Sequence, residues 1–314
     1  MKINNNHYYC VIGIGNHADS KLIPSLEKSG KKIIGLVSRS NNSYIRKYKR
    51  YRNIDQAIIN LPKNTVFVVS TPPNTHYYFI KKLLKKNKNL IIEKPIFTSL
   101  NQIKSCKKFY FSKNNTIFIK EAFMYRYTLM YKKSISFIKN EFNKIETIMC
   151  NFVLPSNPPN SFRDQKTLDS SCLYDIGSYI FDFFVSLDVK ISSLDIVEAN
   201  FYNSKLLNLS FSFKLGHIKV YSKIGIGNKY TNSLITKTFS GEEIEFSTFF
   251  YGRPSKKIIK NISENTKFVF YDKNSFTKMF RENDKMKCLY KPREYYKLYK
   301  INKILLELSN KLSY

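Results

Sequence analysis

Residues 8–18 have the sequence Tyr8-Tyr-Cys-Val-Ile-Gly-Ile-Gly-Asn-His-Ala18. A short apolar run ends in two glycines, and an amphipathic segment over residues 20–27 follows. This order of strand, glycine turn and helix is typical of the dinucleotide-binding fold. There Gly13 would make the turn, Gly15 would let the backbone approach a pyrophosphate and Ala18 would pack closely on the strand. A tight turn without a ligand is the alternative that this stretch alone leaves open.

The second strand, predicted over Lys32–Val37, ends in Ser38-Arg39-Ser40. An NAD site usually presents a carboxylate to the ribose hydroxyls about 20 residues beyond the glycines. No Asp or Glu occurs between Glu27 and Asp55. A guanidinium between two hydroxyls instead suits a 2′-phosphate, which Arg grips in bidentate fashion. We therefore expect NADP as the cofactor in preference to NAD.

The composition limits which classes of protein are possible. The chain has 314 residues, 43% of them hydrophobic, which is enough for two domains or one large one. Five cysteines and four histidines are scattered without paired spacing, so neither a disulfide framework nor a metal site is indicated. No apolar run of about 18 residues occurs, and the first seven residues are unlike a signal peptide. We expect a soluble cytoplasmic protein with no membrane partner.

A net charge of +30 invites a nucleic-acid interpretation. The stretch Tyr44–Arg52 interleaves basic and aromatic residues, as single-strand-binding surfaces do. However, the excess charge is spread along the chain, together with abundant Asn, Ile, Tyr and Phe, whose codons are A/T-rich. We attribute the charge to this composition and Tyr44–Arg52 to a solvated segment on the adenosine side of the cofactor. No specific nucleic-acid partner is expected.

The alternation of elements predicts two domains. Strands and helices alternate over residues 1–122, with a helix at Leu100–Phe111, which predicts a doubly wound parallel sheet. Later segments of strand length, beginning with Ile145–Leu154, follow one another with few helices between them. We therefore predict an α/β fold with a Rossmann domain at residues 1–122 and a second domain with an open, largely antiparallel sheet at residues 123–314.

The segment Leu90-Ile-Ile-Glu-Lys-Pro95 ends a buried strand in a charge pair. The ring of Pro95 disfavours helical geometry at Lys94, so a long cationic side chain is held at the end of a strand. Ligands of open α/β sheets gather at such strand ends. The alternative is a surface ion pair between Glu93 and Lys94, and this segment alone favours it.

The segment Tyr174–Leu187 is predicted to be a helix with an apolar stripe on one side. Asp175, Tyr179 and Asp182 fall together on the other side, so a carboxylate and a phenol four residues apart point the same way. Gly177 costs helix stability, which indicates a close approach to the backbone there. Alternatively, Asp175 is only a capping acid and Tyr179 a residue at the edge of the apolar stripe.

Five motifs resemble those of the Gfo/Idh/MocA oxidoreductases in order and approximate spacing, over about the first 190 residues. They are the glycine turn, Thr71-Pro-Pro-Asn74 with His76, Glu93-Lys94-Pro95, Glu121-Ala-Phe-Met-Tyr-Arg126 and Asp175-Ile-Gly-Ser-Tyr179-Ile-Phe-Asp182. The tyrosine at position 179 resembles the residue found there in one branch of the family, which contains dimeric dihydrodiol dehydrogenases, xylose dehydrogenases and sugar-nucleotide 3-ketoreductases. The Glu-Ala-Phe-Met-Tyr-Arg stretch resembles the first two of these.

This resemblance implies a dehydrogenase or ketoreductase that acts on the CH–OH group of a sugar or nucleotide sugar. Its second domain would carry substrate and subunit contacts, so we expect a homo-oligomer. Lys94 would line the nicotinamide site and reach the substrate hydroxyl, and Asp175 would orient the substrate. The expected cofactor-binding residues are Gly13, Gly15, Asn16, His17, Ser38, Arg39, Ser40, Thr71, Pro72, Asn74, His76, Glu93, Lys94 and Arg163.

The chemistry of the reaction agrees with these roles. Hydride transfer to a ketone leaves an alkoxide that needs a proton, and the reverse direction needs one removed. An unperturbed Tyr has a pKa near ~10, which is high for a base at neutral pH. A neighbouring ammonium favours the phenolate, so Lys94 beside Tyr179 would form an acid/base pair.

One departure from the family motivates a second hypothesis. The chain has Asp169-Ser-Ser-Cys172 where the family commonly has a Gly-rich run. A non-catalytic relative that binds NADP or sugar and acts by interaction is the alternative function. No motif in the sequence distinguishes a free sugar from a nucleotide sugar, or gives the physiological direction.

Overall fold

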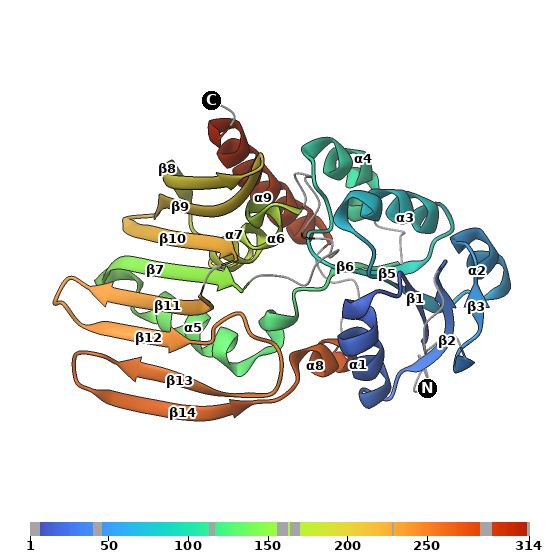
Figure 1. Ribbon diagram of the computed structural model, residues 1–314, viewed down its shortest axis with the longest axis horizontal. Coiled ribbons are helices and arrows are strands. Elements are labelled where there is room, and N and C mark those ends of the chain that lie inside the picture. Colours follow the sequence, from blue (N-terminus) through green and yellow to red (C-terminus); the bar gives the residue numbers. More distant parts are fainter. Residues whose placement is uncertain are drawn as a thin grey trace. The chain divides into compact units, whose positions relative to one another are not determined.

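A computed structural model describes residues 7–39, 46–112, 117–155, 163, 170–227, 229–282 and 291–312. The chain divides into two compact units. The first contains residues 1–124 and 276–295, and the second contains residues 125–275 and 296–314. Each unit has its own sheet (Figure 1). The boundary predicted after residue 122 stays a prediction.

The first unit is built on a six-stranded parallel sheet in the order β3-β2-β1-β4-β5-β6. Strand β4 is buried along its whole length, because helices cover both faces of such a sheet. Its elements are β1 (Tyr8–Ile12), a π-helical turn η1 (Ala18–Leu22), α1 (Ile23–Lys28), β2 (Lys32–Val37), β3 (Arg50–Tyr51), α2 (Ile54–Asn60), β4 (Thr65–Val69), α3 (Pro73–Lys85), β5 (Asn89–Ile92), α4 (Leu100–Phe111) and β6 (Ile119–Glu121).

The second unit is built on an eight-stranded sheet in the order β14-β13-β12-β11-β7-β10-β9-β8. Every neighbouring pair is antiparallel except β7 with β10. Its elements are α5 (Leu129–Asn140), η4 (Phe142–Lys144), β7 (Ile145–Leu154), α6 (Cys172–Asp175), α7 (Gly177–Ser186), β8 (Ile191–Tyr202), β9 (Lys205–Leu215), β10 (Ile218–Ile226), β11 (Thr231–Thr238), β12 (Glu243–Ser247), β13 (Ser255–Asn261) and β14 (Thr266–Asp272). The predicted fold class is confirmed.

Three elements cross from one unit to the other along the chain. They are η3 (Met124–Tyr127), α8 (Ser275–Glu282) and α9 (Lys291–Leu312).

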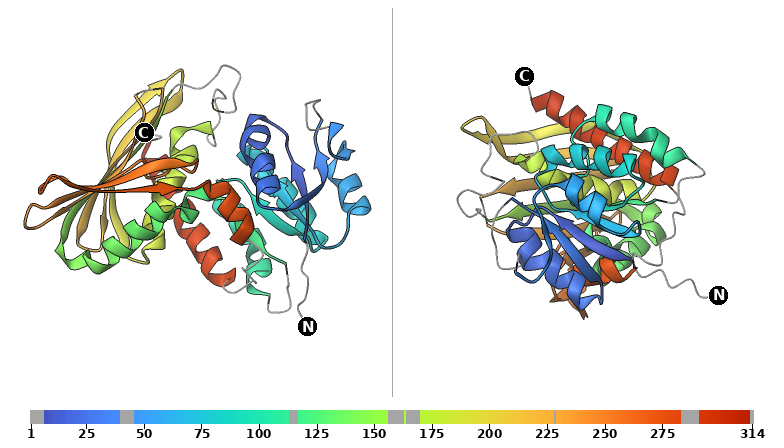
Figure 2. Two further views of the ribbon diagram at one scale, coloured as in Figure 1. Left: turned by 90° about the horizontal axis from the view of Figure 1, so that it is seen from below. Right: turned by 90° about the vertical axis from the view of Figure 1, so that its right-hand side faces the viewer.

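Helices of the second unit lie on one face of its sheet (Figure 2). Phe181 of α7 stacks on Phe211 of β9, with ring centroids 5.4 Å apart, and Phe137 of α5 packs on Phe246 of β12 at 5.5 Å. On the opposite face β10 exposes Lys219, Tyr221 and Lys223. The sheet is therefore half-buried, which explains the alternation of apolar and polar residues along its strands.

The helix predicted over Tyr174–Leu187 is in fact two helices, because α6 ends at Asp175 and α7 begins at Gly177. A Cβ atom at Gly177 would lie 3.2 Å from Cδ1 of Ile224 on β10. The predicted close approach at Gly177 is thus made by the sheet of the same unit. The glycine indicated the close approach, but the local sequence does not identify the partner, Ile224.

Within the described ranges, no helix combines the length and the apolarity that a membrane crossing requires. The same ranges contain no group of three or more His, Cys, Asp or Glu side chains that could hold a metal ion.

Candidate active site

The glycine turn after β1 depends on a backbone conformation that favours glycine. Gly13 has φ +84°, and its N–H donates to the carbonyl of Val37 at 3.0 Å. A Cβ atom at this position would lie 2.6 Å from Cγ2 of Thr71 and 2.9 Å from the carbonyl oxygen of Ser70. Only glycine therefore lets this turn approach the end of β4.

The second glycine lies in a different environment. A Cβ atom at Gly15 would meet no atom within 4 Å, and both Gly15 and Asn16 are exposed. Ala18 is fully buried. The backbone at Gly15 is therefore open to a ligand, while Ala18 provides the close packing predicted for the third position. This arrangement fits the phosphates of a dinucleotide.

The end of β2 is held by an arginine that is not among the predicted site residues. Arg50 of β3 donates from Nε to the carbonyl of Ser38 and from Nη2 to the carbonyl of Arg39, both at 2.8 Å. The side chain of Arg39 is exposed at this strand end. Ser40 lies outside the described residues. The basic stretch that contains Arg50 was a signal for its role, but the pairing of β3 with β2 was not evident from sequence.

The turn after β4 is held by a buried histidine. His76 is fully buried on α3, with Nδ1 2.9 Å from the carbonyl oxygen of Pro95 and Nε2 2.8 Å from that of Thr71. Both partners only accept hydrogen bonds, and a neutral imidazole has a single N–H. Through these two contacts the ring joins the turn after β4 to the turn after β5. Pro72 and Asn74 are exposed on the same turn.

Glu93, at the end of β5, binds His17 of the glycine turn, with 2.9 Å between Oε1 and Nε2. Burial would raise the pKa of Glu93, but the charges of His17, Lys94 and His76 and the hydrogen bond from His17 outweigh it and lower that pKa. Glu93 therefore remains a carboxylate. The ring of Phe276 packs against His17 at 5.8 Å. Lys94 is half-buried beside this group.

The first unit thus gathers the predicted cofactor residues at the carboxyl ends of β1, β2, β4 and β5, which is where ligands of such sheets bind. The gathered residues are Gly13, Gly15, Asn16, His17, Ser38, Arg39, Thr71, Pro72, Asn74, His76, Glu93 and Lys94. Their roles at the cofactor stay predictions.

The second unit contains Asp175 on α6, Tyr179 on α7 and Arg163, which is paired with Asp175. Asp175 ends α6, and its Oδ2 accepts a 2.5 Å hydrogen bond from Nε of Arg163. The side chain of Asp175 is 7% exposed and that of Arg163 is 33% exposed. Arg163 was predicted at the cofactor, and in the described structure its guanidinium is paired with Asp175. Asp169, in the loop that departs from the family pattern, lies outside the described residues.

Tyr179 is surrounded by aromatic rings of its own unit. The ring centroids of Tyr125, Phe152 and Phe250 lie 5.6, 5.4 and 5.6 Å from that of Tyr179. These three rings are buried, whereas Tyr179 is partly exposed. The phenol is therefore fixed by packing and partly shielded from water.

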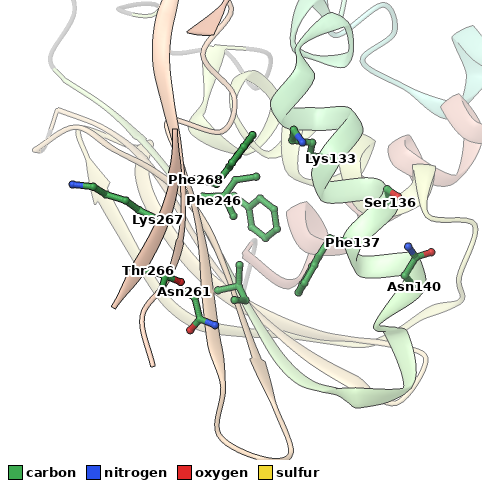
Figure 3. Close-up of a pocket in the computed structure, with 11 residues that line it drawn as sticks. Lys133, Ser136, Phe137, Asn140, Phe246, Asn261, Thr266, Lys267 and Phe268 are labelled. Carbon is green, nitrogen blue, oxygen red and sulfur yellow. The ribbon is translucent and has the colours of Figure 1, made fainter. Parts of the chain in front are cut away.

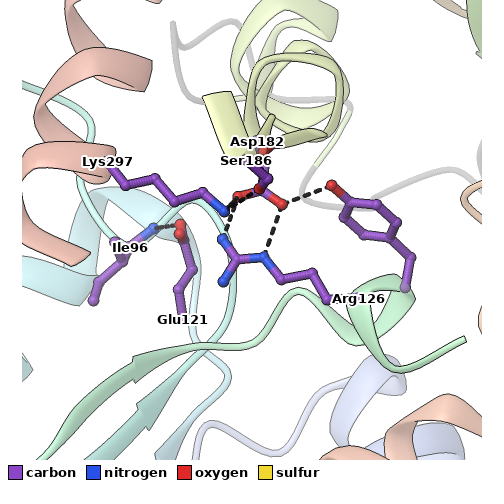
Figure 4. A network of polar contacts seen from close by, with 7 residues as sticks. Ile96, Glu121, Arg126, Asp182, Ser186 and Lys297 are labelled. Atoms are coloured by element: carbon purple, nitrogen blue, oxygen red, sulfur yellow. Dashed lines mark hydrogen bonds and ion pairs between the residues drawn. The ribbon is translucent and has the colours of Figure 1, made fainter. Parts of the chain in front are cut away.

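Asp182 occupies a site of its own one turn after Tyr179 (Figure 4). Its carboxylate is fully buried and accepts hydrogen bonds from Arg126, at Nε (2.8 Å) and Nη2, and from the hydroxyl of Tyr125 at 2.6 Å. Nζ of Lys297 on α9 lies 2.9 Å away. Burial would raise the pKa of Asp182, but Arg126 and Lys297 lower it to about 2. Asp182 thus acts as an anchor between α7, α9 and the segment after β6.

A groove of about 550 Å³ opens in the second unit between α5 and strands β12, β13 and β14 (Figure 3). Phe137, Phe246 and Phe268 line its apolar wall, and Lys133 lies 4.6 Å from the ring centroid of Phe268. None of the predicted catalytic or cofactor residues lines this groove. It is therefore separate from the candidate active site.

Comparisons with known proteins agree with the fold. Residues 8–121 match the Gfo/Idh/MocA family, described as an oxidoreductase family with an NAD-binding Rossmann fold. No curated protein sequence matches the chain. The fold is similar to that of KijD10, a 3-ketoreductase from Actinomadura kijaniata in complex with NADP and TDP-benzene, with a TM-score of 0.80 and 16% identity over 94% of this chain and 96% of that one. An aldose-aldose oxidoreductase from Caulobacter crescentus is also similar, with a TM-score of 0.76 and 16% identity over 95% and 96% of the two chains.

Proposed function

Residues 8–121 carry the NAD-binding Rossmann domain of the Gfo/Idh/MocA oxidoreductase family, and from this premise we propose an NADP-dependent enzyme. It transfers a hydride between nicotinamide and a hydroxyl or ketone of a sugar or sugar nucleotide. The observation that carries this proposal is the arrangement of three groups in the second unit: the carboxylate of Asp175 on α6, the phenol of Tyr179 on α7, and the guanidinium of Arg163 that is hydrogen-bonded to Asp175.

The choice of NADP rests on the end of β2. Arg39 is exposed there, and Arg50 fixes the carbonyls of residues 38 and 39. No carboxylate between residues 27 and 55 is available to bind the ribose hydroxyls of NAD. A guanidinium complements the 2′-phosphate in charge and in geometry. The 3-ketoreductase of similar fold, which was crystallised with NADP, supports the same choice.

The choice of a sugar substrate rests on fold-level analogy and on the chemistry of the second unit. The two similar structures are a 3-ketoreductase with bound TDP-benzene and an aldose-aldose oxidoreductase. In this chain Asp175 can accept a hydrogen bond from a substrate hydroxyl, and Tyr179 can exchange a proton with a second oxygen. A polyhydroxylated substrate suits both groups.

In the proposed reaction the nicotinamide, when bound, donates or accepts the hydride. In the oxidative direction, the Tyr179 phenolate takes the proton of the substrate hydroxyl while the carbon loses its hydride. In the reductive direction, the Tyr179 hydroxyl gives its proton to the oxygen that becomes an alcohol. Lys94 is the proposed partner whose ammonium favours the phenolate, and Asp175 holds the substrate so that the reacting oxygen faces Tyr179.

A cofactor and substrate panel tests the proposal. We expect consumption of NADPH with at least one class of keto sugar or keto nucleotide sugar, and a fall of 10²-fold or more in kcat for Lys94→Ala, since general acid/base catalysis contributes about 10²–10⁴-fold. Lys85→Ala, which removes an exposed lysine of α3, is the matched control and should keep the wild-type rate. Binding of NADP by calorimetry without hydride transfer over the whole panel would favour the non-catalytic alternative.

A further inference from the structure

We propose that Arg163 is a positioning residue for the acid/base phenol: Asp175 holds its guanidinium beside Tyr179, where its positive charge favours the phenolate. This inference deepens the proposed function and rests on it. Arg163, Asp175 and Tyr179 all belong to the second unit. The charge that prepares the base is therefore present before any cofactor binds.

The pairing of Arg163 with Asp175 is short and mostly buried. Nε of Arg163 lies 2.5 Å from Oδ2 of Asp175, whose side chain is almost fully enclosed. Asp175 is itself fixed by α6, since its N–H donates to the carbonyl of Ser171 at 3.0 Å. Charged hydrogen bonds of this kind gain strength where water is excluded. The carboxylate is thus an anchor that sets the position of the guanidinium.

Asp175 ends α6 and Tyr179 lies four residues later on α7, so the guanidinium that Asp175 holds is close enough for its charge to act on the phenol. Burial would lower the pKa of Arg163, but the charge of Asp175, its hydrogen bond and the charge of a Tyr179 phenolate raise it above its ordinary value. Coupling between two titrating groups is reciprocal. An interaction by which the phenolate stabilises the guanidinium must stabilise the phenolate by the same free energy.

The other neighbours of Tyr179 oppose its ionisation. The rings of Tyr125, Phe152 and Phe250 shield the phenol from water, which disfavours a charged form. The negative charge of Asp175 acts in the same direction. Tyr125 does not ionise in its place, because burial and the charge of Asp182 raise the pKa of Tyr125 well above its ordinary value. The positive charge of Arg163 acts against these effects and favours the phenolate.

The pKa of Tyr179 in the free protein tests this inference. The chain has 23 tyrosines, so the measurement uses ¹³C NMR of protein labelled at tyrosine Cζ. The Tyr179 resonance is identified as the one absent from Tyr179→Phe. Arg163→Gln can still donate a hydrogen bond to Asp175 but carries no charge, and it should raise the pKa of Tyr179 by about one unit. Arg163→Lys keeps the charge and should recover at least half of that difference.

Arg293→Met, which removes an exposed arginine of α9, is the matched control for the loss of one positive charge and should leave the pKa of Tyr179 unchanged. Thermal unfolding confirms that each variant is folded. An unchanged Tyr179 pKa in folded Arg163→Gln contradicts the inference, and so does a rise in Arg163→Lys as large as that in Arg163→Gln. The titration needs no cofactor or substrate. A rise in Arg163→Gln together with a wild-type protein that transfers no hydride would refute the proposed function alone.

Discussion

The hydroxyl of Tyr125 donates a 2.6 Å hydrogen bond to Oδ2 of the fully buried Asp182. The ring of Tyr125 also packs against that of Tyr179. The buried carboxylate of Asp182 therefore fixes one of the rings that surround Tyr179, the proposed acid/base residue. The position of the Tyr125 ring therefore depends on a carboxylate that is itself held by Arg126 and Lys297.

Asp182→Asn should destabilise the protein strongly. The substitution leaves Arg126 and Lys297 buried beside a neutral amide, and breaking a buried ion pair in this way costs about 3–5 kcal/mol. Urea unfolding at neutral pH measures the loss. Asp188→Asn changes an exposed aspartate just after α7 and should stay within about 0.5 kcal/mol of wild type. Equal effects of the two substitutions would show that Asp182 is not an anchor.

The same carboxylate predicts a loss of stability in acid. The pKa of Asp182 is about 2 in the folded protein, against ~3.9 in an unfolded chain. The folded-state value is depressed, so the contribution is present above about pH 4 and is lost as pH falls from there towards pH 2, on the order of 2 kcal/mol in all. The free energy of unfolding of wild type should fall more steeply than that of Asp182→Asn across this range. Parallel curves would contradict the assignment.

Lys257 predicts a change at the alkaline end. It is fully buried on β13, and Nζ donates to the carbonyls of Thr248 and Tyr251. Burial lowers its pKa to about 8, although Asp272 opposes the shift, against ~10.4 in an unfolded chain. Between these values the unfolded state binds more protons, so the free energy of unfolding should rise with pH, by up to on the order of 3 kcal/mol.

The control for this rise separates Lys257 from the other lysines and tyrosines that titrate in the same range. Lys257→Met should abolish the rise, whereas Lys256→Met, at the exposed neighbouring position, should keep it. The measurement is urea unfolding at intervals between pH 7 and pH 10.5. A rise of the same size in Lys257→Met would assign it to other groups.

His76→Phe should loosen the cofactor turn. The substitution removes the ring nitrogens that contact the carbonyls of Thr71 and Pro95, and a buried acceptor left without a donor costs about 1–3 kcal/mol. Thermal unfolding measures the loss, and His7→Phe, near the chain terminus, is the comparison. We expect the affinity for NADP to fall along with stability. Wild-type stability in His76→Phe would mean that the two turns are held by other contacts.

Arg39→Ala should reduce the preference for NADP. Charged hydrogen bonds contribute about 1.5–3 kcal/mol, so the Kd for NADP should rise about 10- to 100-fold while that for NAD stays nearly constant. Arg293→Ala, which removes an exposed arginine of α9 within the first unit, is the matched control. Calorimetry measures the Kd for NADP and for NAD. A wild-type enzyme that prefers NAD by a wide margin in kcat/KM would overturn the choice of cofactor.

Much of the fold could be predicted because its signals are local. Strand β2, helix α4 and strand β7 have the predicted bounds, since periodicity and flanking turn residues define them. The break between α6 and α7 could not be predicted, because it accompanies the contact of Gly177 with Ile224 on another element. Tertiary packing overrides helix propensity at such positions.

The sequence predicted which residues form the candidate site, but it predicted few of the contacts between them. The sequence predicted both Glu93 and His17 as cofactor-binding residues but gave no sign of the contact between them, 76 positions apart in the chain. The sequence also predicted Asp182 on the same side of a helix as Asp175 and Tyr179, whereas in the structure Asp182 forms an ion pair with Arg126. Both pairings join segments distant in sequence, and no periodicity reports on them.

The direct test of the central claim is single-turnover hydride transfer in Tyr179→Phe, with NADPH and the best substrate of the panel. The substitution removes one oxygen and keeps the ring within its aromatic surroundings. Tyr174→Phe, on the adjacent helix α6, controls for the loss of a buried phenol. We predict that Tyr179→Phe binds NADPH like wild type but transfers hydride at least 10²-fold more slowly. Transfer at the wild-type rate would contradict the assignment of Tyr179 as the acid/base residue.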